Sequence, residues 1–242
     1  MLRCIERQAD GLLARVGPVS GVGMTLTTDA LTMGYGFLPA NEILRLLGCR
    51  HVYDPGRGHL VTVRDANGRT TVPGVLGVGD GCGLGGARAA EAEGVLAGLA
   101  AAAALGRSPA PTRARAGLAR QRRFQKALWQ LFAAPYPGLA LADPGTVVCR
   151  CEEVTLGEVE IAMADAGNAL GSVKRLTRAG MGRCQGRYCG PLLAGLLAAR
   201  TGQAPDEFAF FAPRPPIRPV PLDAIAGIDE HGVKETEPCR SR

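Results

Sequence analysis

Eight cysteines stand out in this sequence, and four of them fall into two close pairs. Cys149 and Cys151 are separated by one residue, and Cys184 and Cys189 by four residues. The two pairs are 32 residues apart. Four thiolates in two close pairs are the minimum set for a tetrahedral metal ion or a two-iron cluster. The spacing therefore predicts a metal-binding site.

Three kinds of site are compatible with this spacing: inert structural thiols, a structural zinc ion and a [2Fe-2S] cluster. Zinc sites more often use two cysteines separated by two residues, whereas the first pair here is separated by one. Backbone beside an inorganic sulfide must come close and donate N–H groups, and the glycines that crowd the second pair permit both. We therefore favour a [2Fe-2S] cluster, with zinc and inert thiols as the alternatives. The predicted ligands are Cys149, Cys151, Cys184 and Cys189.

Basic residues lie close to the cysteine pairs in the sequence. A [2Fe-2S] cluster with four thiolate ligands carries a net negative charge, which nearby cations offset, and this raises its reduction potential. Glu152 and Glu153 act in the opposite direction, so charge alone gives no value for the potential. The neighbouring cations are Arg150, Lys174, Arg175, Arg178, Arg183 and Arg187.

Three helices are predicted between and after the cysteine pairs. Thr155-Leu-Gly-Glu158 has the pattern of a capping box, which opens a helix that runs to about residue 166. A second helix is predicted over residues 172–179. Pro191 suits the first turn of a third helix, which ends near Gly202.

The cysteine segments resemble a known domain. Residues 148–155 (VCRCEEVT) and 174–191 (KRLTRAGMGRCQGRYCGP) are similar to the BFD-like [2Fe-2S] domain. They resemble the version fused to the FAD-dependent subunit of heteromeric opine oxidases, hydroxyproline dehydrogenases and hydrogen cyanide synthase, and the similarity runs from about Asp29 to Leu222. The resemblance implies electron transfer within an amino-acid or opine dehydrogenase. It also implies that a flavin-containing partner subunit oxidises the substrate, while the cluster relays electrons one at a time.

Residues 70–80 (TTVPGVLGVGD) resemble the second flavin motif of oxidoreductases with two dinucleotide-binding domains. In that motif a strand stops at a glycine, an acid follows, and a glycine-rich turn opens a helix, here predicted over residues 87–104. The resemblance implies that Asp80 accepts a hydrogen bond from a ribityl hydroxyl and that the helix directs its positive end at the flavin ring. The alternative is a generic strand, turn and helix with an aspartate cap. The predicted FAD-binding residues are Gly79, Asp80, Gly81, Gly85, Gly86 and Ala87.

One flavin motif of the family is missing from this sequence. Residues 33–39 (MGYGFLP) resemble another turn of the FAD domain, but the family also opens with a G-x-G-x-x-G segment that holds the FAD pyrophosphate. Residues 17–23 are glycine-rich, yet neither a third glycine nor a helix pattern follows them. We therefore expect the C-terminal portion of a longer subunit, which retains little FAD by itself.

The predicted fold class is α/β, a partial two-dinucleotide-domain FAD fold, followed by a small all-α BFD-like iron-sulfur domain. Strands are predicted at residues 29–34, 59–64 and 75–79, and the first and last are nearly continuous apolar runs, which suits burial on both faces. The predicted parts are an α/β domain (1–106), a helical connector (107–145), the iron-sulfur domain (146–203) and a Pro-rich tail (204–242) that lies along the surface or against a partner.

The other cysteines and the histidines have no predicted chemistry. Cys82 lies in the flavin turn and is a candidate redox thiol, but no resolving cysteine is adjacent, so a small buried residue is the better interpretation. No histidine lies at metal-ligand spacing from another potential ligand, and all three histidines are predicted to lie on the surface. The cysteines and histidines without a predicted role, apart from Cys82, are Cys4, Cys49, Cys239, His51, His59 and His231.

Composition narrows the classes of function. The net charge is +6, carried by 25 Arg and 3 Lys, but no nucleic-acid motif accompanies the mostly dispersed arginines, so we expect no nucleic-acid partner. Residues 1–7 already contain charged side chains and no apolar segment, unlike a signal peptide. The longest apolar run, residues 94–106, is too short to span a bilayer. Both features predict a soluble cytoplasmic protein. The alternative function is a non-enzymatic [2Fe-2S]-binding module with a vestigial flavin half.

Overall fold

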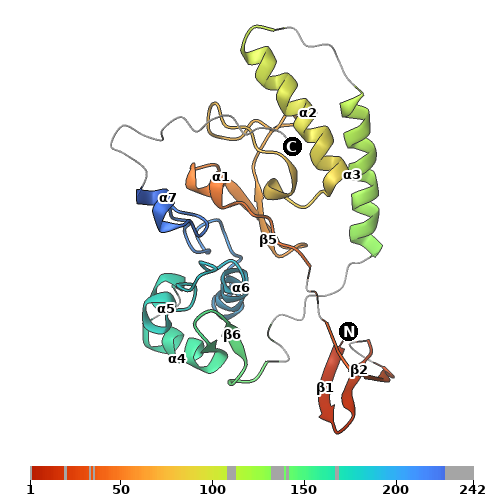
Figure 1. Ribbon diagram of the computed structural model, residues 1–242, viewed down its shortest axis with the longest axis vertical. Helices are drawn as coiled ribbons and strands as arrows, with labels where there is room; N and C mark the ends of the chain where they lie inside the picture. The colour runs from red at the N-terminus through yellow and green to blue at the C-terminus, as the bar shows by residue number, and fades with distance from the viewer. Residues whose placement is uncertain are drawn as a thin grey trace.

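The molecule, a computed structural model, has four parts along the chain (Figure 1). An N-terminal sheet is followed by a small α/β part, a pair of long helices and a C-terminal region that contains the two cysteine pairs. The structure describes residues 2–18, 21–32, 34, 36–107, 113–131, 139, 142–166 and 169–226. Residues 33 and 35, which belong to the predicted FAD-domain turn, lie outside that set, as do Cys239 and His231.

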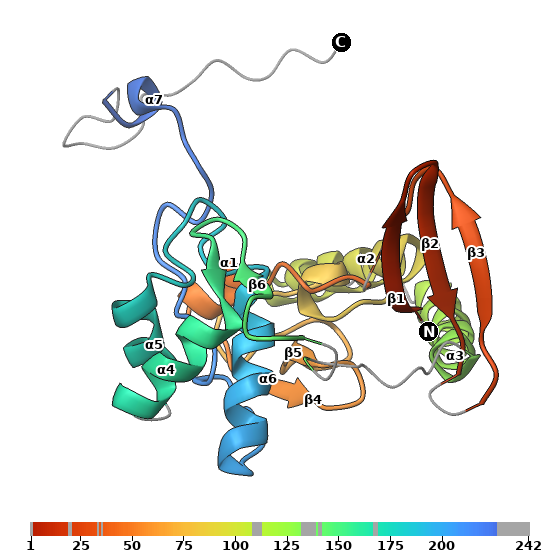
Figure 2. The same ribbon diagram turned by 90° about the horizontal axis from the view of Figure 1, so that it is seen from below.

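The N-terminal sheet contains β1 (Leu2–Gln8), β2 (Gly11–Val16) and β3 (Met24–Thr28). The strands are antiparallel, in the order β1-β2-β3, with Gln8 paired to Gly11 across the first turn. Figure 2 shows this sheet standing apart from the region of the cysteine pairs. The prediction of a strand at 29–34 is wrong, because the described residues there form no strand and the last strand ends at Thr28.

The α/β part consists of α1 (Glu42–Leu46) and the hairpin of β4 (His51–Asp54) and β5 (His59–Thr62). A tight turn follows β5, because Asp65 accepts the backbone N–H groups of Asn67 and Arg69 on its side chain. Residues 75–79 form no strand either; only an isolated bridge between Arg69 and Leu76 lies there. Every paired strand in the described ranges is antiparallel.

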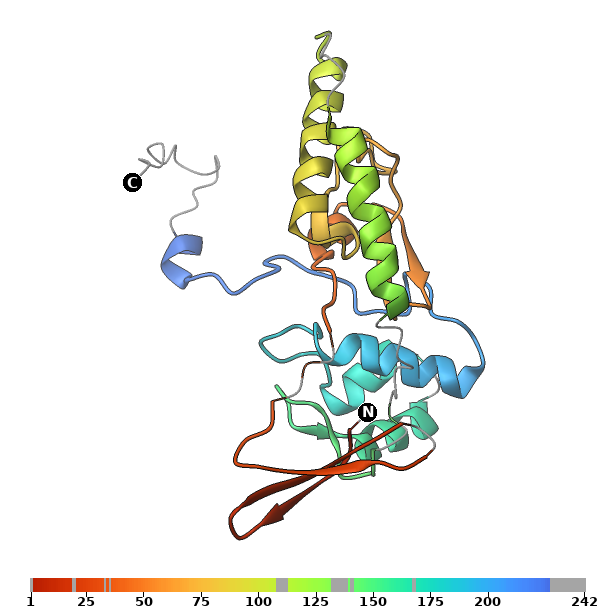
Figure 3. The same cartoon turned by 90° about the vertical axis from the view of Figure 1, so that its right-hand side faces the viewer.

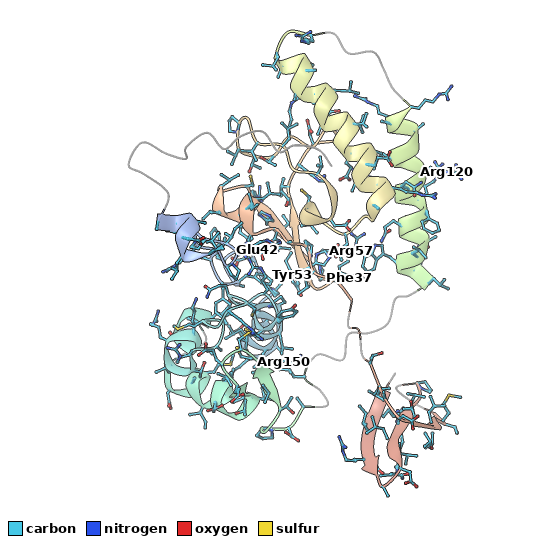
Figure 4. The ribbon with its side chains drawn as sticks, in the orientation of Figure 1. Phe37, Glu42, Tyr53, Arg57, Arg120 and Arg150 are labelled. Atoms are coloured by element: carbon cyan, nitrogen blue, oxygen red, sulfur yellow. The ribbon has the colours of Figure 1, made fainter. Side chains whose placement is uncertain are left out.

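Two long helices pack side by side, as Figure 3 shows. They are α2 (Ala87–Ala104) and α3 (Ala114–Leu131), and α2 has the range that the sequence predicts. Leu118 of α3 is buried against Ala89 and Leu96 of α2. Small side chains on α2 allow this close approach, whereas α3 directs basic residues such as Arg120 away from the contact (Figure 4).

The cysteine region combines a two-stranded sheet, β6 (Val147–Cys149) and β7 (Val154–Thr155), with α4 (Leu156–Ala166), α5 (Leu170–Thr177) and α6 (Cys189–Thr201). The predicted capping box is present: the Glu158 carboxylate accepts the Thr155 N–H at 2.8 Å, and the Thr155 hydroxyl accepts the Glu158 N–H at 3.4 Å. An all-α domain is therefore not what the chain forms, because the first cysteine pair lies on a small β-hairpin.

The core of the cysteine region draws on all of its elements. Val159 and Met163 of α4, Val173 of α5 and Leu193 of α6 are almost completely buried, and the Cys149 and Cys189 side chains lie in the same apolar cluster.

Within the described residues, no helix is both long enough and apolar enough to cross a bilayer.

The segment after α6 passes between the cysteine region and the α/β part. The Phe210 ring lies 6.1 Å from the Tyr53 ring of β4, and Phe211 packs on the core of the cysteine region. Glu207 accepts the backbone N–H of His51 at 2.7 Å. Residues 207–211 of the tail thus contact two parts of the molecule, whereas α7 (Leu222–Ala226), near the end of the described tail, is exposed.

Candidate metal centre

The two cysteine pairs lie on different elements that the core brings together. Cys149 ends β6 and Cys151 follows in the next turn, whereas Cys184 lies in the loop after α5 and Cys189 begins α6. Cys149 and Cys189 are buried at 1% and 2% exposure, and the other two thiols are half-buried. Each pair thus has one inner and one outer sulfur.

The two outer thiols contact each other. Burial of Cys184 opposes its ionisation, but backbone N–H groups of Tyr188, Gly186 and Arg187 and the thiol of Cys151 donate to its sulfur, and the net effect lowers the pKa of Cys184. Hydrogen bonds to the charged form favour the thiolate. These donors therefore favour the thiolate of Cys184, which is the form in which sulfur binds metal.

The two inner thiols also contact each other, in a less polar setting. Burial, and next the proximity of Cys149, raise the pKa of Cys189 to about 12. A thiol in such a setting stays protonated in the absence of a cation. The four sulfurs therefore form two contacts, each of which joins one cysteine of the first pair to one of the second.

Within the described residues, no three or more His, Cys, Asp or Glu side chains converge closely enough to hold one metal ion. The thiols meet two by two instead. A single tetrahedral zinc ion needs all of its ligands around one point, whereas a two-iron cluster is held by two ligands on each iron.

Contacts within the chain also favour glycine beside the second pair. A β-carbon added to Gly182 would lie 2.3 Å from the β-carbon of Cys151, so this glycine lets the two cysteine segments touch. At Gly180 and Gly186 the added carbon would lie 2.3 Å from the Phe211 ring. Both of these residues also have positive φ angles, 81° and 78°, which favour glycine.

Phe211 was missed in the sequence because it lies outside the predicted iron-sulfur domain. Its ring covers the glycine loop, and Lys174 Nζ lies 5.0 Å from the ring centroid. A signal was present: three of the six phenylalanines of the chain fall within residues 208–211, in an otherwise Pro-rich tail. A run of aromatic residues in such a tail indicates a segment that packs against something.

The predicted cations divide into bound and exposed groups. Arg178 pairs with Glu152 at 2.8 Å, Arg187 pairs with Glu42 of α1, and Arg175 donates to Ser172. Arg150 and Arg183 are exposed. Figure 4 shows Arg150 at the cysteine region and Glu42 on the side of the α/β part nearest to it.

The predicted flavin residues form a compact turn before α2. Residues 79–82 make a short 3-10 helix, and Asp80 Oδ1 accepts the N–H groups of Gly85 at 2.9 Å and Gly86 at 2.8 Å. Ala87 then begins α2. Gly81 lies against the Ala40 carbonyl, since a β-carbon there would be 3.3 Å from that oxygen. One oxygen of Asp80 is thus already used to order the turn.

Glu93 of α2 supports the same turn and was not singled out in the sequence. Its carboxylate accepts the Gly79 N–H at 2.9 Å and binds Arg64 through two hydrogen bonds, at 2.8 and 3.0 Å. Both side chains are mostly buried, at 11% and 15% exposure. The available signal was that Glu91 and Glu93 are the two acids of an otherwise Ala-rich helix.

Two further predictions concern buried groups. Cys82 is 1% exposed, and burial raises the pKa of its thiol, which agrees with a small buried residue. The prediction that His51 and His59 lie on the surface is wrong, because both are only 3% exposed. His51 is hydrogen-bonded to the Cys49 carbonyl at 2.7 Å and to the Thr62 hydroxyl at 3.0 Å, whereas neither ring nitrogen of His59 has a hydrogen-bond partner among the residues that the structure describes.

Comparison with known proteins places these features in context. Residues 145–228 match the family model of the sarcosine oxidase A3 domain, which spans the cysteine region and the described tail. The chain is 34% identical over 232 residues to the opine oxidase A subunit of Rhizobium meliloti (strain 1021), which covers 93% of this chain and 50% of that protein. It is 31% identical over 206 residues to the HcnB subunit of hydrogen cyanide synthase from Pseudomonas aeruginosa. That alignment covers 83% of this chain and 44% of the HcnB subunit.

A solved structure has a similar fold. L-proline dehydrogenase from P. horikoshii superimposes with a TM-score of 0.67 over 92% of this chain and 43% of that one, at 22% identity. The chain spans about half the length of the curated relatives that it matches. The chain is thus similar in sequence to subunits of opine oxidase and hydrogen cyanide synthase. Its fold is similar to that of L-proline dehydrogenase, and its cysteine region matches the sarcosine oxidase A3 domain.

Proposed function

We propose that this chain holds a [2Fe-2S] cluster on Cys149, Cys151, Cys184 and Cys189, and that it transfers electrons in an oxidoreductase. Its substrates would be opines or amino-acid-like compounds, oxidised at a flavin-containing partner subunit. Two relatives are themselves subunits, of opine oxidase and of hydrogen cyanide synthase. The observation that carries the proposal is the meeting of the four thiols in two contacts, Cys151 with Cys184 and Cys149 with Cys189.

The residues around the sulfurs suit such a cluster. Two thiols for each of two irons match the two observed contacts better than one tetrahedral ion does. The N–H groups that donate to Cys184 would stabilise thiolate and sulfide charge, which favours the reduced cluster. When bound, the cluster would accept and release single electrons. The chain's own contribution is to hold the ligands, to supply these donors and, through Phe211, to exclude water from one side of the loop.

The turn before α2 is proposed to bind part of a flavin. Gly79, Asp80, Gly81, Gly85, Gly86 and Ala87 would bring backbone N–H groups and the positive end of α2 to an electron-rich ring. The G-x-G-x-x-G pattern at residues 81–86 falls within the turn proposed for the flavin ring, and no second one remains for the pyrophosphate, so we expect FAD to be retained weakly by this chain alone. Gel filtration followed by flavin absorbance measures that retention, and near-stoichiometric flavin would contradict the expectation.

A non-enzymatic [2Fe-2S]-binding module is the second candidate. It is favoured by the hydrogen bonds that Asp80 Oδ1 makes within its own turn, which leave the turn ordered without a flavin. Association with a flavin-containing partner subunit distinguishes the candidates, because only the oxidoreductase role requires it.

The decisive experiment is anaerobic purification with iron, sulfide and zinc assays and an absorption spectrum. A brown protein with about two irons and two sulfides for each chain is expected for a [2Fe-2S] cluster. Cys184→Ser should remove the colour and lower the melting temperature of the cysteine region, because metal-binding energy contributes to folding. Cys4→Ser is the matched control, since Cys4 is an exposed thiol of the N-terminal sheet. A colourless wild-type protein with one zinc ion would exclude the cluster.

A further inference from the structure

Arg187 connects three parts of the molecule. It lies in the loop between Cys184 and Cys189, and its side chain is 28% exposed. The guanidinium donates through Nη1 to the Cys184 carbonyl at 3.1 Å, through Nε to Glu42 of α1, and through Nη2 to the Ile217 carbonyl of the tail. No other cation near the cysteines has contacts to all three of these segments in the described structure.

Glu42 links this arginine to the predicted flavin turn. It begins α1, directly after Asn41, which is buried at 8% exposure, and Ala40, whose carbonyl lies against Gly81. The Glu42 side chain is 18% exposed, so the ion pair with Arg187 is largely shielded from water. Figure 4 shows Glu42 on the side of the α/β part nearest to the cysteine region. A short chain of contacts thus runs from Cys184 through Arg187 and Glu42 to the turn that contains Asp80.

We infer that Arg187 is a positioning residue that docks the second cysteine pair on the α/β part and raises the reduction potential of the cluster held there. This inference rests on the proposed [2Fe-2S] function. A fixed positive charge beside a cluster stabilises the more negative, reduced state. Glu42 fixes the guanidinium in place and offsets part of its charge, so the pair sets both the position of the loop and the size of the electrostatic effect.

Arg183 provides a matched control for charge. It is adjacent to Cys184 in the sequence, it is exposed, and it has no hydrogen bond or ion pair to any described residue. Arg183→Gln and Arg187→Gln therefore remove the same charge from the same loop. Only the second substitution also removes the contacts to Cys184, Glu42 and Ile217.

The test is a potentiometric titration of the anaerobically reconstituted full chain, followed by electron paramagnetic resonance of the reduced cluster. At the wild-type midpoint potential, Arg187→Gln should lower the ratio of reduced to oxidised cluster roughly three- to tenfold, and Arg183→Gln less than about twofold because water screens an exposed charge. Arg187→Lys should restore part of the shift, and Glu42→Gln should shift the potential in the opposite direction.

Hydrogen exchange of the metal-free full chain supplies a second measurement that needs no cluster. Arg187→Gln and Glu42→Gln should speed exchange of the amides at residues 185–190, whereas Arg183→Gln should not. The inference would be overturned by equal shifts of the reduction potential in the two arginine variants, or by unchanged hydrogen exchange in Arg187→Gln. In either case a wild-type protein with a full complement of iron and sulfide would leave the proposed function intact. Absence of iron and sulfide from the wild type would overturn both.

Discussion

Phe211 packs so closely on Gly180 that a β-carbon added to the glycine would lie 2.3 Å from Cε2 of the ring. The two residues are separated by α6 and come from parts of the sequence with different composition. Their contact makes the tail a component of the cysteine region. It also places Phe211, which lies after the predicted boundary at residue 203, against the loop that carries Cys184 and Cys189.

Substitution of Gly180 by alanine should destabilise the cysteine region. The new methyl group would meet the Phe211 ring, and the φ angle of 81° is unfavourable for alanine, so we expect a loss of about 2–4 kcal/mol in the free energy of unfolding. Gly195→Ala in α6 is the matched control, because nothing lies within 4 Å of an added β-carbon there; it should gain about 0.5–1 kcal/mol. Denaturant unfolding measures both, and equal stability of the two variants would contradict the contact.

Removal of the Phe211 ring should loosen the cysteine loop. Phe211→Ala should cost about 2–3 kcal/mol, because the partly buried ring packs against the core of that region. Phe208, three residues earlier, is 84% exposed, so Phe208→Ala should change stability by less than about 0.5 kcal/mol. In anaerobically loaded protein, Phe211→Ala should also lose its colour faster in the presence of a chelator. Indistinguishable melting and bleaching of the two variants would show that the tail is dispensable.

Glu93 should give the α/β part a specific dependence on pH. Burial raises the pKa of this carboxyl group, but the Arg64 guanidinium and the Gly79 N–H outweigh burial and hold the pKa below its usual 4.5. A carboxyl group whose pKa is lower in the folded state stabilises the protein above its unfolded pKa, and the stabilisation is lost as the pH falls through the folded value. Glu93→Gln should therefore cost about 2 kcal/mol at pH 7 and progressively less below about pH 4.5. A constant difference between wild type and variant from pH 7 to pH 3 would refute this role.

His59 should oppose folding at acidic pH. Burial lowers the pKa of its imidazole below the usual 6.5, so the unfolded chain binds a proton that the folded chain does not. The stability of the α/β part should accordingly be constant above about pH 6.5 and decrease as the pH falls below that value. His59→Leu should reduce this decrease, and the remainder is expected from His51, whose pKa burial also lowers. Since neither ring nitrogen of His59 has a partner among the described residues, the variant should also gain about 1 kcal/mol at neutral pH. An unaltered pH profile in the variant would show that the ring is hydrated.

Local sequence predicted those elements whose stabilising contacts lie within a few residues. The helix Ala87–Ala104 and the reciprocal hydrogen bonds of Thr155 and Glu158 follow from side chains that are neighbours on a single helix turn. The close spacing within each cysteine pair likewise fixes which thiols are neighbours along the chain. For these features the sequence separation is short, so composition and spacing are sufficient.

Tertiary structure decided everything that depends on segments distant in the sequence. Apolar residues at 75–79 suit a strand, but no neighbouring strand pairs with them along their length, and a strand exists only when another chain segment satisfies its backbone hydrogen bonds. Burial of His51 and His59 depends on the elements that cover them, which their own positions in the chain do not reveal. The sequence determined that two cysteine pairs are available; the packing of β6, α6 and the Phe211 segment decided that their sulfurs meet, because long-range burial, rather than spacing, brings them together.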